Sequence, residues 1–173
     1  LYSKYATEIT RADWENSIHN QSNVDVFCDL NEVLIFGSNS FDSIILSDVI
    51  NHLSEPEIAL NEIYRILKPG GILLLTAPFL YNLNEEPFDF GRYSIHKYRF
   101  WAAKLKFKII QVEQFGGIND VIEHFLLRIL YLLPFGSLMC RVIYSMRTFF
   151  VEHEFLKINN TNCPYGYGVI MIK

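Results

Sequence analysis

The stretch FDSIILSDVINHLSEPEIALNEIYRILKPGGILLLTAPF, residues 41–79, decides the fold of this chain. It opens with the apolar run Phe41–Ser47 and closes on a second apolar run, Ile72–Thr76, and both have the length and composition of strands buried on two faces. Between them lies a segment with helical periodicity. The order strand, helix, strand is the repeating unit of an α/β protein with a parallel sheet.

The intervening helix carries its own start and stop signals. Ser54 precedes Glu55-Pro56-Glu57, which places a capping residue, early carboxylates and a proline in the first turn. The sequence Lys68-Pro69-Gly70-Gly71 ends the helix, because proline cannot continue it and glycine accepts a left-handed turn. An apolar stripe at helical spacing gives the face that we expect to be buried: Ala59, Leu60, Ile63, Ile66 and Leu67.

The flanking sequence continues the alternation of strands and helices. Period and composition predict strands at residues 5–9, 23–29, 107–115 and 165–172 and a helix at residues 94–105. We therefore expect an α/β fold with a doubly wound, mostly parallel sheet, formed by a single domain over residues 1–173. In such sheets ligands bind beyond the carboxyl ends of the strands, so a site is expected in the loops that follow the strands.

Composition limits the classes of function. Half of the 173 residues are apolar, enough for one substantial core, and the net charge of −4 argues against a nucleic-acid binder. The three cysteines lie far apart and are odd in number, which favours neither disulfides nor a CxxC metal site and indicates a reducing, cytoplasmic environment. The five histidines show no spacing typical of metal ligands, so we predict no metal.

Residues 41–79 resemble the central block of class I S-adenosylmethionine-dependent methyltransferases, especially the group that contains the ubiquinone-type enzymes. By this resemblance the chain is identified as a methyltransferase type 11-like domain. The resemblance implies a Rossmann-like fold and S-adenosylmethionine as the cofactor. The cofactor-binding residues that it implies are Glu8, Asp29, Leu30, Ser47 and Asp48.

Each of these residues takes a role from the family. Asp29 corresponds to the acidic strand-end residue that contacts the adenine amine. Glu8 corresponds to the carboxylate that accepts hydrogen bonds from the ribose hydroxyls, since an ionised carboxylate can serve two donors. Ser47 and Asp48 correspond to the residues beside the methionine and the sulfonium of the cofactor.

The sequence departs from the family in one place. The family has a glycine-rich turn before the ribose-binding carboxylate, and no such motif precedes Glu8. We expect the first strand and this turn to be lacking, so that the domain is N-terminally incomplete and activity depends on a preceding segment of the full protein. The alternative is a degenerate methyltransferase-like binding or scaffold module without cofactor binding. A nicotinamide-dependent oxidoreductase is disfavoured, because it needs a G-x-G-x-x-G turn at the first strand.

The segment NEEPFDFGRYSIHKYR, residues 84–99, is similar to an acidic, aromatic loop that borders the acceptor pocket in a subset of these proteins. Its polar side chains are predicted to orient an acceptor through charge-assisted hydrogen bonds, and the alternative is a solvated loop with an internal Asp89–Arg92 ion pair. His52 has the titration range of a general base, and a structural role on the helix surface is the competing interpretation. The predicted substrate-binding residues are Glu86, Asp89, Arg92, Tyr93 and His96.

Residues 118–151 are the most apolar part of the sequence and are predicted to form two helices joined by a turn at residues 133–136, inserted before the last strand. Their uncharged runs are too short to span a bilayer. The favoured interpretation is a lid or homodimer surface over the acceptor pocket, and the alternative is an interfacial segment in peripheral contact with a membrane. The sequence thus predicts a methyltransferase that acts on a small or lipid-linked metabolite.

Overall fold

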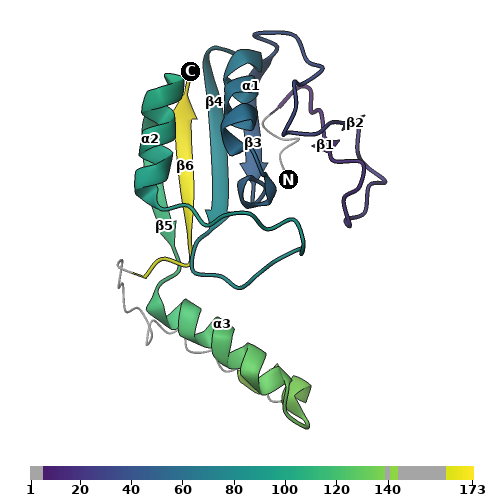
Figure 1. The fold of residues 1–173 in the computed structure, drawn as a ribbon, viewed down its shortest axis with the longest axis vertical. Helices are drawn as coiled ribbons and strands as arrows, with labels where there is room; N and C mark the ends of the chain where they lie inside the picture. The colour runs from purple at the N-terminus through teal and green to yellow at the C-terminus, as the bar shows by residue number, and fades with distance from the viewer. Residues whose placement is uncertain (1–5, 139–140, 144–162) are drawn as a thin grey trace.

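A four-stranded sheet forms the centre of the protein. The computed structural model describes residues 6–138, 141–143 and 163–173. The strands are ordered β3-β4-β6-β5 across the sheet, and β6 is antiparallel to both of its neighbours, whereas β3 and β4 are parallel (Figure 1). Their bounds are Phe41–Ser47 for β3, Leu67–Pro78 for β4, Lys108–Phe115 for β5 and Gly166–Ile172 for β6.

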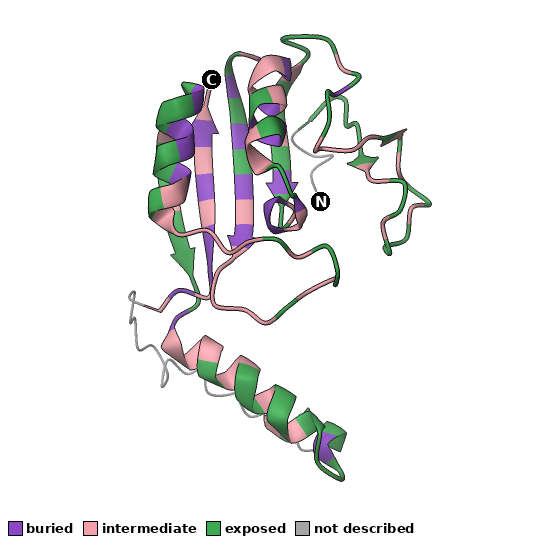
Figure 2. Ribbon diagram, viewed as in Figure 1, coloured by how far each residue is buried: buried purple, intermediate pink, exposed green. Residues whose placement is uncertain are grey.

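Two helices cover one face of this sheet. They are α1, Pro56–Ile66, and α2, Ile95–Leu105, which contact each other as well as the strands beneath them. Glu57 of α1 joins the two helices, because it accepts a hydrogen bond of 3.0 Å from the indole N–H of Trp101. The buried residues of strands and helices face one another across this layer (Figure 2), which gives the molecule one hydrophobic core.

The opposite face of the sheet is more open. Alternate residues of a strand point to opposite faces, and on this face the side chains of Ile45, Ile72 and Leu74 are exposed. The cross-strand pairs Ser43–Ile72 and Ile45–Leu74 set these residues side by side on β3 and β4. The described helices α1 and α2 therefore leave the apolar second face of these two strands accessible to solvent.

The chain before β3 forms a second, two-stranded sheet. Its strands β1, Ala12–Asp13, and β2, Val26–Phe27, are parallel, and the backbone N–H of Arg11 donates to the Asp25 carboxylate at 2.7 Å beside them. The strand expected at residues 5–9 is not present in residues 6–10, and residues 1–5 lie outside the described part. That expectation was wrong because pairing with β2, rather than local pattern, sets where β1 lies.

Several expected elements are confirmed. Within residues 41–79, the structure differs from the expectation in two details. The strands at Phe41–Ser47 and near residues 107–115 and 165–172 are present, as are both helices. Ser54 does not cap α1, since its hydroxyl donates to the Asn31 side chain at 3.1 Å. β4 begins at Leu67 rather than Ile72, and its register with β3 shifts where Gly70 takes a left-handed φ of 78°.

A third helix leaves the sheet after β5. Helix α3, Ile118–Tyr131, follows Gly116, whose φ of 66° turns the chain, and it extends away from the layer of α1 and α2 (Figure 1). The second helix predicted for this region falls mostly on residues outside the described part. Across the described ranges, no helix has both the length and the apolar character needed to cross a bilayer.

Candidate functional site

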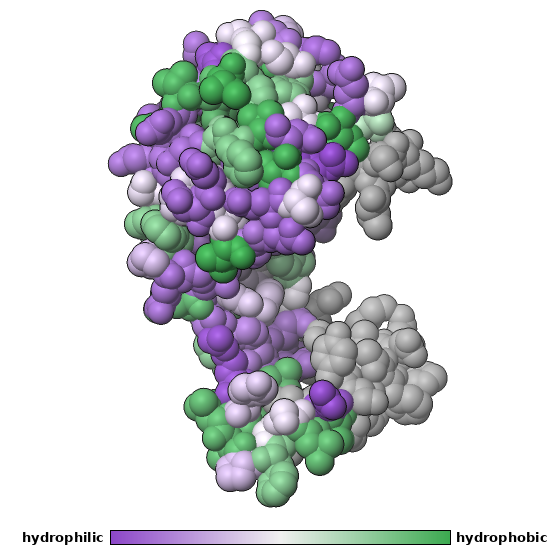
Figure 3. All heavy atoms as spheres, turned by 90° about the vertical axis from the view of Figure 1, so that its right-hand side faces the viewer, coloured by the Kyte–Doolittle hydropathy of each residue, from purple (hydrophilic) through white to green (hydrophobic). Residues whose placement is uncertain are grey.

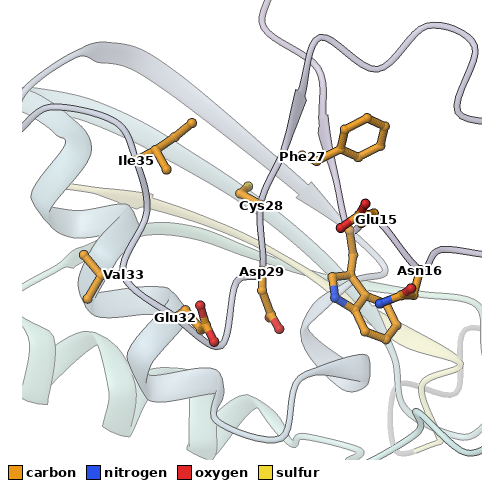
Figure 4. Close-up of a pocket in the computed structure, with 9 residues that line it drawn as sticks. Glu15, Asn16, Phe27, Cys28, Asp29, Glu32, Val33 and Ile35 are labelled. Carbon is orange, nitrogen blue, oxygen red and sulfur yellow. The ribbon is translucent and has the colours of Figure 1, made fainter.

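A pocket opens where the two short strands end. Its volume is about 300 Å³, at the small end of the range of roughly 300–1,000 Å³ typical of ligand pockets. Figure 4 shows Asp29 between Glu32 on one side and Glu15 and Asn16 on the other. Its nine lining residues combine carboxylates with apolar and aromatic side chains: Trp14, Glu15, Asn16, Phe27, Cys28, Asp29, Glu32, Val33 and Ile35.

Strand β1 ends at Asp13, and the next residue, Trp14, lines this pocket. The Asp13 carboxylate accepts the backbone N–H of Trp14 at 2.8 Å, and its carbonyl accepts the N–H of Cys28 at 3.0 Å. The indole of Trp14 packs edge-to-face on Phe88, with ring centroids 5.0 Å apart. Strand pairing and this aromatic contact therefore fix an acidic and an aromatic side chain side by side at the end of β1.

Asp29, which the sequence singled out, follows β2 and lines the pocket. Its Oδ1 accepts two hydrogen bonds from Asn31, one from the backbone N–H at 2.8 Å and one from the side-chain amide at 3.0 Å. The Oδ1 of Asn31 in turn accepts from the Ser54 hydroxyl and the Glu55 backbone N–H. This Asx-type turn ties the pocket to the start of α1 and restricts the orientation of the carboxylate.

The acidic character of the pocket affects the pKa of Cys28. Burial raises the pKa of this thiol, and the negative charges of Asp29 and Asp13 raise the pKa further. Both carboxylates therefore disfavour the thiolate, and the thiol stays neutral near pH 7. A pocket with this charge favours ligands that present hydrogen-bond donors.

Glu8 and Leu30, two of the predicted cofactor-binding residues, do not line the pocket. Glu8, predicted to end the first strand, lies before β1 and is exposed. The acidic residue that ends β1 is Asp13, so the predicted strand end was wrong. Asp13 and Trp14 were missed, although an acidic residue directly after Ala12 and before an aromatic one was a signal in the sequence. Leu30 is partly buried and packs against the core.

Ser47 and Asp48 lie together at the carboxyl ends of β3 and β4, as the sequence predicted for a strand end. The Ser47 hydroxyl lies 3.0 Å from that of Thr76, which donates to the Asp48 carboxylate at 3.4 Å. Asp48 has a left-handed φ of 55°, and its backbone N–H donates to the Thr76 carbonyl at 2.9 Å. This backbone conformation is strained for a residue other than glycine, and it persists only where the surrounding structure stabilises it.

His52 is engaged on both sides of its ring. Its Nδ1 lies 2.5 Å from the carbonyl of Phe88, and its Nε2 lies 3.0 Å from the side-chain nitrogen of Asn51. With Nδ1 donating and Nε2 accepting, both ring nitrogens are occupied. This geometry favours the structural interpretation of His52, which connects the short helix Ile50–His52 to the loop after β4.

The predicted acceptor-binding residues divide into two groups. Asp89 and Arg92 form the internal ion pair that was the alternative interpretation: the guanidinium donates to both carboxylate oxygens, at 2.5 and 2.7 Å, and Arg92 also donates to the Asn82 carbonyl. The Arg92 guanidinium lowers the pKa of Asp89. Glu86 and His96 are exposed.

Tyr93 is partly buried among aromatic rings. Its ring lies 4.7 Å from that of Trp101 and 6.4 Å from that of Tyr98, and burial raises the pKa of its hydroxyl. Within the described residues, the buried polar atoms without a hydrogen-bond partner include the Tyr98 hydroxyl, near these rings, and Oδ1 of Asn51, which follows β3. No local pattern in the sequence indicates these two residues, because both are buried only through the packing of distant elements.

Comparison with known proteins agrees with this architecture. Residues 2–75 match the family described as "Methyltransferase domain". The ubiquinone/menaquinone biosynthesis C-methyltransferase UbiE of Citrobacter koseri is 38% identical over 68 residues, which cover 38% of this chain and 26% of that protein. The mitochondrial ubiquinone biosynthesis O-methyltransferase of Rattus norvegicus is 37% identical over 49 residues, or 28% of this chain and 14% of that protein.

The fold has relatives among solved structures. A SAM-dependent methyltransferase from Archaeoglobus fulgidus matches with a TM-score of 0.56 at 17% sequence identity, covering 87% of this chain and 68% of that one. The sheet, with its reversed β6, and the strand-end site define a Rossmann-like α/β protein. The sequence matches make residues 2–75 similar to methyltransferase domains. The chain spans about a quarter, or less, of the length of the curated relatives it matches.

Proposed function

We propose that this domain binds S-adenosylmethionine and takes part in methyl transfer to a small or lipid-linked metabolite. The observation that carries the proposal is the pocket of about 300 Å³ beside the ends of β1 and β2, where the negative charges of Asp13 and Asp29 both act on Cys28. These residues lie inside the stretch that matches the methyltransferase family. Their chemistry fits the nucleoside part of the cofactor.

The two carboxylates have complementary tasks in this proposal. Asp29 accepts a hydrogen bond from the adenine amine, and Asp13 accepts two from the ribose hydroxyls, as an ionised carboxylate can. Asp13 takes this role instead of Glu8 because it ends β1. Trp14, held by Phe88, offers an aromatic face beside the base.

The strand ends of β3 and β4 face the reacting part of the cofactor in this proposal. S-adenosylmethionine supplies the methyl group when it is bound. The residues of the chain mainly align donor and acceptor, since displacement at a methyl group depends on in-line geometry. Ser47 and Asp48, restrained by Thr76, are suited to that positioning. His52 holds the loop after β4 in place.

The acceptor is proposed to be a small or lipid-linked metabolite. Two of the matching relatives are named for quinone biosynthesis, and one of them transfers to carbon while the other transfers to oxygen. The same domain thus occurs with different acceptor atoms. The Asp89–Arg92 pair supports the loop that borders this region, and Glu86 and His96 are its exposed polar groups.

Calorimetric titration of the 173-residue chain with 5′-methylthioadenosine tests the nucleoside contacts without the methionine end. We expect binding, and a loss of tenfold or more in affinity for Asp13→Asn and for Asp29→Asn, because each change removes a charge-assisted hydrogen bond of about 1.5–3 kcal/mol. The control is Asp42→Asn, at the opposite end of β3, where an exposed ion pair with Lys68 is lost. Its affinity should equal that of the unchanged chain.

A second nucleoside separates the roles of the two carboxylates. 5′-Methylthioinosine lacks the adenine amine, so the effect of Asp29→Asn should disappear with this ligand while that of Asp13→Asn remains. Equal affinity of all variants would contradict the assigned roles. Absence of binding by a chain that is folded by circular dichroism would favour the alternative of a methyltransferase-like scaffold.

A further inference from the structure

Within the described part of the chain, His124 connects helix α3 to the loop after β4 and to the residue before β6. The ring of His124 packs on Tyr81, with centroids 4.6 Å apart, and its Nε2 is hydrogen-bonded to the Asn82 side chain. The hydroxyl of Tyr165, which precedes β6, lies 3.3 Å from the other nitrogen of the same ring. Among the residues of α3, all of which the structure describes, none is buried. These contacts join the helix to the protein through the middle of its length.

The free face of α3 is apolar and continues into the turn that follows. On the helix the exposed side chains recur at the spacing i, i+3, i+4, i+7, so they lie on one face, opposite His124. In the turn, Leu132 and Phe135 are 84% and 81% exposed. We call this surface the apolar tip; it consists of Ile122, Phe125, Leu126, Ile129, Leu132 and Phe135.

The apolar tip gathers at one end of the molecule. Figure 3 shows hydrophobic residues at the lower end, where α3 and the turn after it lie. Exposed apolar side chains that are concentrated in this way mark a surface that contacts another apolar phase. Scattered exposed apolar residues elsewhere on a protein need no such explanation.

Positive charge gathers in the later part of this region. The acidic residues of α3, Asp120 and Glu123, lie in the first half of the helix, whereas residues 124–151 include three arginines and no aspartate or glutamate in a chain whose net charge is −4. Arg128 and Arg141 are exposed, and Tyr131 beside them is also exposed. Cationic and aromatic side chains that flank an apolar surface are typical of segments at a membrane interface.

The dimensions of α3 exclude a spanning helix. Its 14 residues extend about 21 Å, less than the roughly 30 Å of a bilayer core, and Arg128 interrupts the apolar sequence. A second copy of the chain fits less well than a lipid surface. Pairing two apolar tips end to end would bring Arg128 and Arg141 of both copies together, because Asp120 and Glu123 lie in the first half of α3, away from the tip.

We infer that the apolar tip inserts into the surface of an anionic lipid bilayer and that Arg128 and Arg141 contact the lipid phosphates. The helix lies in the interface, with its apolar face toward the acyl chains and His124 toward the protein. Binding of this kind combines apolar burial with electrostatic attraction, so it requires anionic lipid and weakens as salt screens the charges. The inference does not depend on methyl transfer.

Vesicle flotation with the 173-residue chain tests this directly. We expect the chain to float with vesicles of phosphatidylglycerol and phosphatidylcholine, to stay unbound with pure phosphatidylcholine, and to dissociate in high salt. The double variant Leu132→Ser/Phe135→Ser should lower partitioning at least tenfold. Its two sites are nearly fully exposed, so the fold should be kept, which circular dichroism and 5′-methylthioadenosine binding would check.

Matched variants distinguish the two contributions. Arg128→Gln/Arg141→Gln should reduce binding to anionic vesicles and abolish its salt dependence, whereas Ile18→Ser, an exposed apolar residue outside the tip, should bind as the unchanged chain does. Failure of the unchanged chain to float with anionic vesicles would overturn the inference. So would a dimer in sedimentation that is lost in Leu132→Ser/Phe135→Ser, because the tip would then bind a second copy.

Discussion

Asp89 and Arg92 form an ion pair in which the Asp89 side chain is buried. The Asp89 side chain is only 3% exposed, and it accepts a further hydrogen bond from the backbone N–H of Asn84 at 2.8 Å. Replacing Asp89 by Asn leaves the Arg92 charge without its partner. Since breaking a buried pair in this way costs several kcal/mol, we expect Asp89→Asn to lower the free energy of unfolding in urea by about 3 kcal/mol at pH 7.

The effect of Asp89→Asn on the free energy of unfolding should depend on pH. The pKa of Asp89 is lowered in the folded protein, mainly by Arg92, so its stabilisation is present above the unfolded value of about 3.9 and is lost as the pH falls through the folded value. The difference between the two proteins should shrink below about pH 4. Asp42→Asn is the control, because Asp42 is 85% exposed and its pair should contribute below about 1 kcal/mol. A difference that grows in acid would contradict the assignment.

At this scale the sequence could predict residues whose position follows from a local strand end. Asp29 and the Ser47-Asp48 pair lie where the pattern placed them, because each follows directly on an apolar strand. Asp13 was missed because β1 has two residues, too few for a period, and its end depends on pairing with β2. The buried polar atoms of Asn51 and Tyr98 depend on packing between elements, which no local pattern encodes.

At the scale of an element, helix α1 shows what the apolar periodicity of the sequence can predict. Its apolar stripe was predicted from spacing alone, and Ala59, Leu60, Ile63 and Ile66 are buried. The segment Lys68–Gly71 was expected only to stop the helix, whereas it also forms the irregular first part of β4. The register shift needs β3 as a partner, so turn composition could predict the helix end but not the strand start.

Two isoleucines of α1 provide a matched test of this face. Ile63 is 1% exposed within the core, and Ile58 on the outer side is 40% exposed. We expect Ile63→Ala to lower the free energy of unfolding by about 2–5 kcal/mol, through lost transfer energy and the cavity that remains. Ile58→Ala should change it by less than about 1 kcal/mol, because its site stays open to water. Equal effects in urea denaturation would show that α1 packs through a different face.

On the scale of the whole molecule, the sheet combines segments far apart in the chain. β4 pairs with β6, so residues 72–78 lie beside residues 166–172, and β6 then pairs with β5. The sequence predicted these strands but not their order or the reversal of β6. Strand order is decided by which apolar faces α1 and α2 can cover together, a property of the assembled core.

The same assembly leaves the protein with two levels of local stability. β4 and β6 are inner strands of the sheet and contribute Leu73, Leu75, Val169 and Met171 to the core, whereas α3 has no buried residue among its described positions. Opening α3 exposes little additional apolar surface, and opening β4 disrupts the core. Hydrogen exchange should therefore be faster in α3 than in β4 and β6.

Exchange followed by mass spectrometry checks this prediction with an internal control. Helix α1 also exchanges hydrogen-bonded helical amides, but four of its residues are buried, so its amides should be protected more strongly than those of α3. The contrast isolates burial from helix formation itself. Protection of α3 equal to that of β4 would mean that the helix unfolds only with the core, which would contradict the prediction.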